Sequence, residues 1–98
     1  MAFTDDYDFH LLKNEAEKLV INELEMQLKN VPSSVCRCND CIIDMAAIAM
    51  NTVKPLYRYS LLGSMYTSQA MHEDSYADSV KKAVSQAITK VRKNPSHD

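Results

Sequence analysis

Three cysteines stand within six consecutive positions, in the order Cys36-Arg37-Cys38-Asn39-Asp40-Cys41. Thiolates are soft ligands that suit zinc, copper(I) and iron–sulfur clusters. The two-residue gap between Cys38 and Cys41 is typical of zinc knuckles, in which both sulfurs reach one ion while the backbone turns. Cys36 can reach the same ion from the preceding loop. The cluster therefore predicts a metal site, and zinc is the favoured ion.

The residues alone leave other interpretations of this cluster open. The cysteines could be small buried hydrophobic side chains, a copper site, an iron–sulfur cluster or a redox thiol. Three sulfurs also leave one corner of a tetrahedron to fill. The candidates for that corner are His72, His10, His97, a carboxylate, a water or a group from a second subunit, and His72 is preferred because it precedes the last predicted helix.

Length and composition narrow the class of protein. A chain of 98 residues holds one hydrophobic core, so we expect a single domain spanning residues 1–98. The formal charge of −2 argues against a protein that coats DNA or RNA. The sequence shows neither a signal peptide nor a membrane-spanning apolar run, so we expect a soluble cytoplasmic protein with no membrane partner. In that reducing compartment, clustered cysteines favour metal or redox chemistry over disulfides.

Hydrophobic spacing predicts a mainly α fold. Apolar residues at steps of three and four predict a first helix from about Asp6 to Val31, ended by Pro32. Its apolar face is wider than one neighbouring helix would cover, which favours a homodimer. A second helix, from about Asp40 to Val53, is apolar nearly all round and is expected to be buried, with Asn39 as its N-cap. The last helix is expected from about Ser75 to Lys93.

The segment from Leu56 to Ala70 has the least regular pattern. Its tyrosines and large apolar side chains flank Leu62-Gly63-Ser64, which can form a turn. A small β-hairpin is the favoured interpretation, and an irregular loop is the alternative. The predicted fold is thus a small helical domain with a short cysteine-rich metal loop and a small β-hairpin.

The residues that surround the cysteines resemble the signature of the late competence development protein ComFB family. That signature is CxCxxC, an aspartate three residues on, an alanine-rich helix ending in Leu-Asn, and then Pro-Pro and a tyrosine. The matching residues here are Cys36, Cys38, Cys41, Asp44, Asn51, Pro55 and Tyr57. The chain departs from the signature at Met50, where leucine is usual, and at Lys54, where the first proline is expected.

The resemblance implies a mostly helical bacterial homodimer that holds zinc through its cysteine cluster. Some family members are receptors for cyclic dinucleotides, chiefly cyclic di-GMP, and are linked to motility, pili or competence. The local candidates for such a ligand are Lys54, Tyr57 and Arg58, because Arg forks and aromatic rings commonly hold guanine nucleotides. The alternative is a hairpin with tyrosines packed inward and cations in water.

We therefore expect a non-enzymatic, zinc-binding regulatory protein, a cyclic dinucleotide receptor that passes a signal to a protein partner. One alternative is a thiol redox or metal-handling protein. Another is a zinc-stabilised protein-interaction module with no nucleotide ligand. An enzyme that uses the open zinc position is disfavoured, because no general base or nucleophile is evident beside the cysteines.

Overall fold

The computed structural model describes residues 2–60, 62, 65, 68–69 and 73–95. Its fold is mainly α with a small antiparallel pair of strands, as the sequence predicts. The elements, in chain order, are α1 (Phe3–Asp6), the 3₁₀ helix η1 (Phe9–Leu11), β1 (Lys13–Asn14), α2 (Ala16–Leu28), α3 (Asn39–Thr52), β2 (Tyr57–Arg58) and α5 (Asp74–Lys93).

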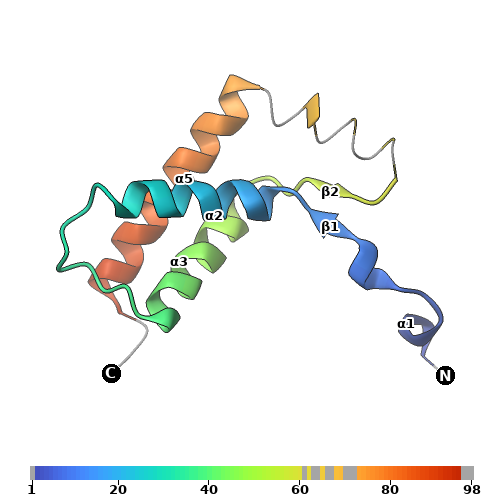
Figure 1. The fold of residues 1–98 in the computed structure, drawn as a ribbon, viewed down its shortest axis with the longest axis horizontal. Helices are drawn as coiled ribbons and strands as arrows, with labels where there is room; N and C mark the ends of the chain where they lie inside the picture. The colour runs from blue at the N-terminus through green and yellow to red at the C-terminus, as the bar shows by residue number, and fades with distance from the viewer. Residues whose placement is uncertain (1, 61, 63–64, 66–67, 70–72, 96–98) are drawn as a thin grey trace.

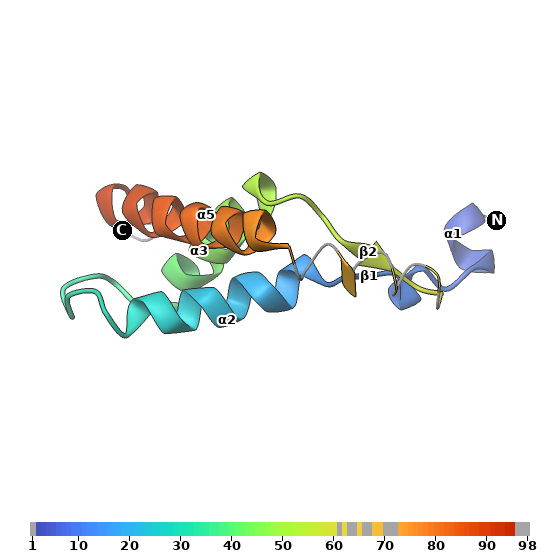
Figure 2. The same cartoon turned by 90° about the horizontal axis from the view of Figure 1, so that it is seen from above.

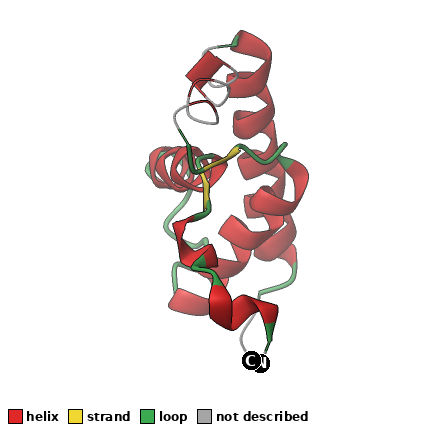
Figure 3. Ribbon diagram, turned by 90° about the vertical axis from the view of Figure 1, so that its right-hand side faces the viewer, coloured by secondary structure: helices red, strands yellow, loops and turns green. Residues whose placement is uncertain are grey.

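The core lies where α2, α3 and α5 pack together. Figures 1 and 2 show α5 beside α3, with α2 crossing the same bundle, while the N-terminal segment extends away from it. Figure 3 shows the same arrangement end-on, with the short strands between the bundle and the N-terminal segment. The largest fully buried side chains are Met45, Val20, Val84 and Cys41. A cysteine of the predicted metal site is therefore also part of the core.

Helix α5 follows its predicted bounds closely, since it begins one residue before Ser75 and ends at Lys93. Its buried residues recur at helical spacing along one face: Tyr76, Val80, Ala83, Val84, Ala87, Ile88 and Val91. The hydroxyl of Tyr76 donates a 2.8 Å hydrogen bond to the Lys54 carbonyl. This bond links α5 to the segment that follows α3. Burial raises the pKa of Tyr76 above its ordinary value, which keeps the hydroxyl protonated as a donor.

Helix α3 also lies close to its predicted range, but two details of the prediction are wrong. Its N-cap is Cys38, whose sulfur accepts a hydrogen bond from the Cys41 amide, while Asn39 is the first residue inside the helix. The helix is buried along one face only, through Cys41, Met45 and Ala49. Ile43 is 59% exposed, because α2 and α5 supply the main packing against α3 among the described residues and leave its outer side in solvent.

The predicted first helix, Asp6 to Val31, is too long at its start. The chain forms α1, η1 and β1 before α2 begins at Ala16. The Asn14 side chain explains the break, because its Oδ1 accepts hydrogen bonds from the Ala16 amide (3.2 Å) and the Leu56 amide (2.8 Å). Asparagine competes in this way for backbone groups and favours a helix start over a helix interior. Residues 2–12 thus lie outside the long helix, and we call them the N-terminal arm.

The strand in the predicted hairpin segment is real, but its partner is distant in sequence. β2 pairs with β1 in antiparallel register, with Lys13 opposite Arg58 and Asn14 opposite Tyr57. The pairing joins the residues directly after the N-terminal arm to the chain that leaves α3. Further along the predicted hairpin, Leu62 and Met65 have helical backbone. Across the described ranges, no helix is both long and apolar enough to cross a membrane.

Candidate metal centre

A short loop of residues 29–38 leads from α2 to the cysteines. It turns at residues 32–35, where the Val35 amide donates a 3.1 Å hydrogen bond to the Pro32 carbonyl. The Val35 side chain is 2% exposed and belongs to the same core cluster as Cys41. A buried valine therefore anchors the loop directly before the first cysteine.

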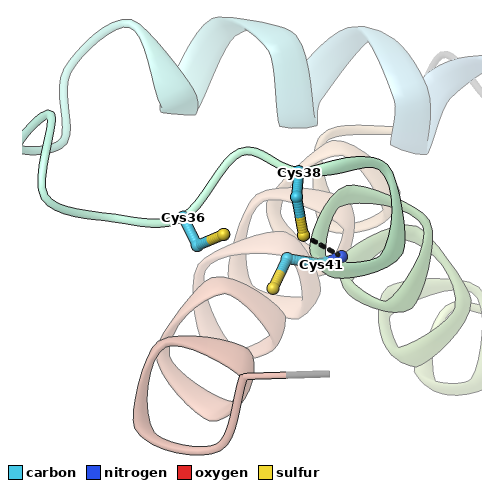
Figure 4. A group of neighbouring side chains, drawn as sticks. All are labelled: Cys36, Cys38 and Cys41. Carbon is cyan, nitrogen blue, oxygen red and sulfur yellow. Dashed lines mark hydrogen bonds between the residues drawn. The ribbon is translucent and has the colours of Figure 1, made fainter. Parts of the chain in front are cut away.

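The structure brings the three predicted ligands together. Cys36 comes from the loop, Cys38 caps α3 and Cys41 lies in its first turn, and their sulfurs all lie within 4.8 Å of one another. Figure 4 shows the three sulfurs gathered on one side of the loop, with α2 on the other side. Cys41 is buried, Cys36 is half-buried and Cys38 is the most exposed of the three.

The start of α3 places backbone donors and partial positive charge beside the cluster. The Cys41 amide donates to the Cys38 sulfur over 3.4 Å, in the place where a serine or aspartate usually caps a helix. The first-turn amides and the macrodipole place partial positive charge at this end of the helix. The Cys38 sulfur, which caps the helix, lies at this end.

This donor set fits zinc. With Zn–S bonds of about 2.3 Å, two sulfurs on a tetrahedral ion lie about 3.8 Å apart. The sulfurs here lie within 4.8 Å, so a movement on the order of 1 Å would bring all three onto one ion. Soft sulfur donors at this spacing could also hold other thiophilic metals. The arrangement places Cys36, Cys38 and Cys41 where they could hold one metal ion, with one position left for another group.

The structure narrows the choice of the fourth ligand. Where residues are described, the only group of cysteine, histidine and carboxylate side chains close enough to share an ion is the three cysteines. His10 lies in η1, within the N-terminal arm and away from the cysteine loop. His72 and His97 lie outside the described residues. A water or a second subunit remains compatible with the fourth position.

Arg37 has a role that the sequence pattern did not indicate. Its guanidinium donates hydrogen bonds to backbone carbonyls of the loop and of α2. The shortest of these bonds reach the Leu28 carbonyl (2.6 Å) and the Val35 carbonyl (3.0 Å). The sequence does not indicate which way a long side chain between two cysteines turns.

The predicted ligand-binding residues do not share one face. Tyr57 and Arg58 are consecutive residues of β2, so their side chains point to opposite sides of the strand pair. Arg58 pairs with Glu15 and lines a cavity of about 460 Å³, together with Lys13 and Lys18. Tyr57 is 58% exposed on the other side, and Lys54 is exposed on the connection before β2. Lys13 and Lys18 are therefore two further cations at this cavity, which the sequence pattern did not single out.

Comparison with known proteins identifies relatives of this fold. The family model described as late competence development protein ComFB matches residues 13–95. Among solved structures, the late competence protein ComFB from Bacillus subtilis superposes with a TM-score of 0.69 at 21% sequence identity. The superposition covers 87% of this chain and 92% of that chain. No curated protein sequence matches the chain. The family match begins at β1, so the N-terminal arm lies before it.

Proposed function

This chain belongs to the late competence development protein ComFB family, and we propose that it is a non-enzymatic, zinc-binding regulatory protein that acts as a single domain over residues 1–98. Family membership supports a role related to competence. The observation that carries the zinc proposal is the approach of three sulfurs to within 4.8 Å at the start of α3. The ion would join the loop after α2 to α3, and its role would be structural.

The proposed ligand of the protein is a cyclic dinucleotide, cyclic di-GMP in particular. The cavity beside Arg58 supports this proposal, because its volume of about 460 Å³ suits a ligand of this size. Arg58, Lys13 and Lys18 could contact the two phosphates, and Arg58 could also bind a guanine edge as a fork. Glu15 and Glu17 also line the cavity and reduce its net positive charge. Binding would then compete with the pairing of Arg58 and Glu15.

Calorimetric titration of the zinc-loaded protein with cyclic di-GMP tests this ligand, with cyclic di-AMP as the control ligand. We expect saturable binding of cyclic di-GMP that becomes about 10- to 100-fold weaker in Arg58→Ala, because a hydrogen bond to a charged group contributes about 1.5–3 kcal/mol. Arg92→Ala, which removes an exposed arginine from the last turn of α5, should bind like the unchanged protein.

Two outcomes of the titration would change the proposal. Full-strength binding in Arg58→Ala would move the ligand site away from the cavity. Absence of binding by the unchanged protein at tens of micromolar would favour a zinc-stabilised interaction module with a protein partner and no nucleotide ligand.

We also propose that the protein is a homodimer. The apolar face of α2, on which the sequence argument rested, is largely used inside the chain by Ala16, Val20 and Leu24. The N-terminal arm supplies another apolar surface, with five large side chains that are 48–66% exposed: Phe3, Tyr7, Phe9, Leu11 and Leu12. Their combined exposed area is about 500 Å² at about 200 Å² for each whole side chain. A reciprocal contact would cover about 1,000 Å², the lower end for a specific interface.

Sedimentation equilibrium measures this association. We expect a mass twice the 11.1 kDa of one chain, and a dimer dissociation constant that rises at least about tenfold in Leu11→Asp, because the change places a charge in the proposed contact. Ile43→Asp changes an exposed aliphatic residue on α3 and serves as the matched control. A monomeric mass, or equal weakening by both variants, would contradict an interface at the arm.

A further inference from the structure

We propose that Arg37 is a positioning residue of the metal centre, which fixes the loop in the shape that brings the three sulfurs together. The inference rests on the proposed metal binding by the cysteines. Arg37 is not a ligand itself. It acts through the backbone that precedes it, from the end of α2 to Val35, and it thereby directs Cys36 and Cys38.

The contacts of Arg37 define this role. One terminal nitrogen of the guanidinium donates to the Leu28 carbonyl at 2.6 Å and, more weakly, to the Val31 carbonyl at 3.5 Å. The other donates to the Val35 carbonyl at 3.0 Å and to the Pro32 carbonyl at 3.4 Å. The four carbonyls span the end of α2 and the turn that follows it. A single side chain therefore holds the end of α2 and the turn before the cysteines together.

The same contacts satisfy the C-terminal end of α2. The last carbonyls of a helix have no partner within the helix, and a cation near them is also favoured by the macrodipole. Leu28 is the last residue of α2, and Arg37 supplies the donor to its carbonyl from nine positions further along the chain. The bond fixes the distance between the end of α2 and the cysteine cluster.

The direction of the Arg37 side chain determines the direction of its neighbours. Cys38 has extended backbone (φ −68°, ψ 162°), in which successive side chains point to opposite sides. Arg37 is fastened on the α2 side of the loop, so the cysteines that flank it are turned to the other side. Figure 4 shows this result, with α2 on one side of the loop and the Cys36 and Cys38 sulfurs directed away from it, toward Cys41.

Lysine cannot replace Arg37 in this arrangement. A guanidinium has two terminal nitrogens in a rigid plane, and here one serves the α2 end while the other serves Val35. An ammonium group is one compact charge on a flexible stem and would not hold both carbonyls in fixed geometry. Arg37→Lys therefore keeps the positive charge but removes the pair of hydrogen-bonding nitrogens. The variant thus distinguishes an effect of loop positioning from an effect of charge.

The test measures metal affinity and coordination in the full chain, for the unchanged protein, Arg37→Lys and the control Arg92→Lys. Arg92 is exposed on the last turn of α5 and undergoes the same chemical change. Zinc affinity is measured by competition with a chromophoric chelator, and the cobalt(II) absorption spectrum reports the coordination. We expect Arg37→Lys to bind zinc about 10- to 100-fold more weakly, the range for residues that orient metal ligands, with a weaker tetrahedral cobalt spectrum. Arg92→Lys should match the unchanged protein.

Circular dichroism of each metal-free variant shows whether its helices persist. If Arg37→Lys loses its helices, Arg37→Gln is measured in its place, and loss of helix in both would overturn the inference in favour of a role in folding. Unchanged zinc affinity and cobalt spectrum in a folded variant would also overturn it, even if the melting temperature fell. Failure of the unchanged protein to bind either metal would instead refute the metal site itself.

Discussion

Removal of zinc from the loaded protein by a strong chelator is expected to lower the melting temperature by about 10–20 °C. A ligand that binds only the folded state stabilises it by about 2.7 kcal/mol when its free concentration is a hundred times its dissociation constant. For a domain of this size, each kcal/mol shifts the melting temperature by about 4–8 °C. The effect is large because Cys41 belongs to the core, so the ion would tie the loop to the packed part of α3. Differential scanning calorimetry, with and without chelator, measures the shift.

Cys38→Ser isolates the contribution of the metal from other effects of a cysteine substitution. Cys38 is the most exposed of the three cysteines, so its replacement removes little packing. Serine is also a preferred N-cap, and its hydroxyl oxygen can accept a hydrogen bond from the Cys41 amide as the sulfur does. The variant should therefore melt near the temperature of the chelated protein and should show no response to the chelator. Cys41→Ser is less informative, because that side chain is fully buried and its change also disturbs the core.

Two results would contradict this account. If the chelator left the melting temperature of the unchanged protein in place, the cysteines would be packing residues and not a structural site. If mild peroxide released the ion from an otherwise stable protein, the thiol redox or metal-handling alternative would be favoured over a structural role. A structural site stays loaded under the same treatment, which zinc analysis after gel filtration would show.

The cysteine cluster and helices α3 and α5 could be predicted because their signals are local. The spacing of Cys36, Cys38 and Cys41 was sufficient to predict that one ion could reach all three, and the structure places their sulfurs close together. Helix α5 carries an apolar residue at nearly every third or fourth position and ends at a cluster of basic residues. Both features depend on residues within a few positions of one another.

The errors arise where partners are distant in the sequence. The apolar spacing from Phe9 to Leu12 continues the pattern of α2, so periodicity alone could not indicate that the helix begins at Ala16. The break depends on the Asn14 side chain, which binds the Leu56 amide 42 positions away, and on the pairing of β1 with β2. The N-cap of α3 was misassigned for a different reason: cysteine is an uncommon cap, and it serves here because the metal loop places its sulfur beside the Cys41 amide.

Met45→Ala is expected to destabilise the protein by about 2–5 kcal/mol, because it empties the centre of the α2–α3–α5 core. Met45 is 1% exposed and ranks first by volume among the fully buried side chains. It lies one helical turn after Cys41, on the same buried face of α3. A loss of this size corresponds to a fall in melting temperature of about 10–40 °C. Urea titration of the zinc-loaded protein, followed by circular dichroism, measures the change in the free energy of unfolding.

Met26→Ala provides the matched control, because it makes the same substitution on α2 at a side chain that is 58% exposed. Its effect should stay within about 0.5 kcal/mol, as is usual for surface changes. The folded fraction of Met45→Ala should still bind one zinc per chain, since the sulfurs are held by the loop and the start of α3. A loss in Met45→Ala no larger than that of Met26→Ala would mean that α3 and α5 do not form the stabilising contact. Loss of zinc from folded Met45→Ala would mean that the core, and not the loop, sets the geometry of the metal centre.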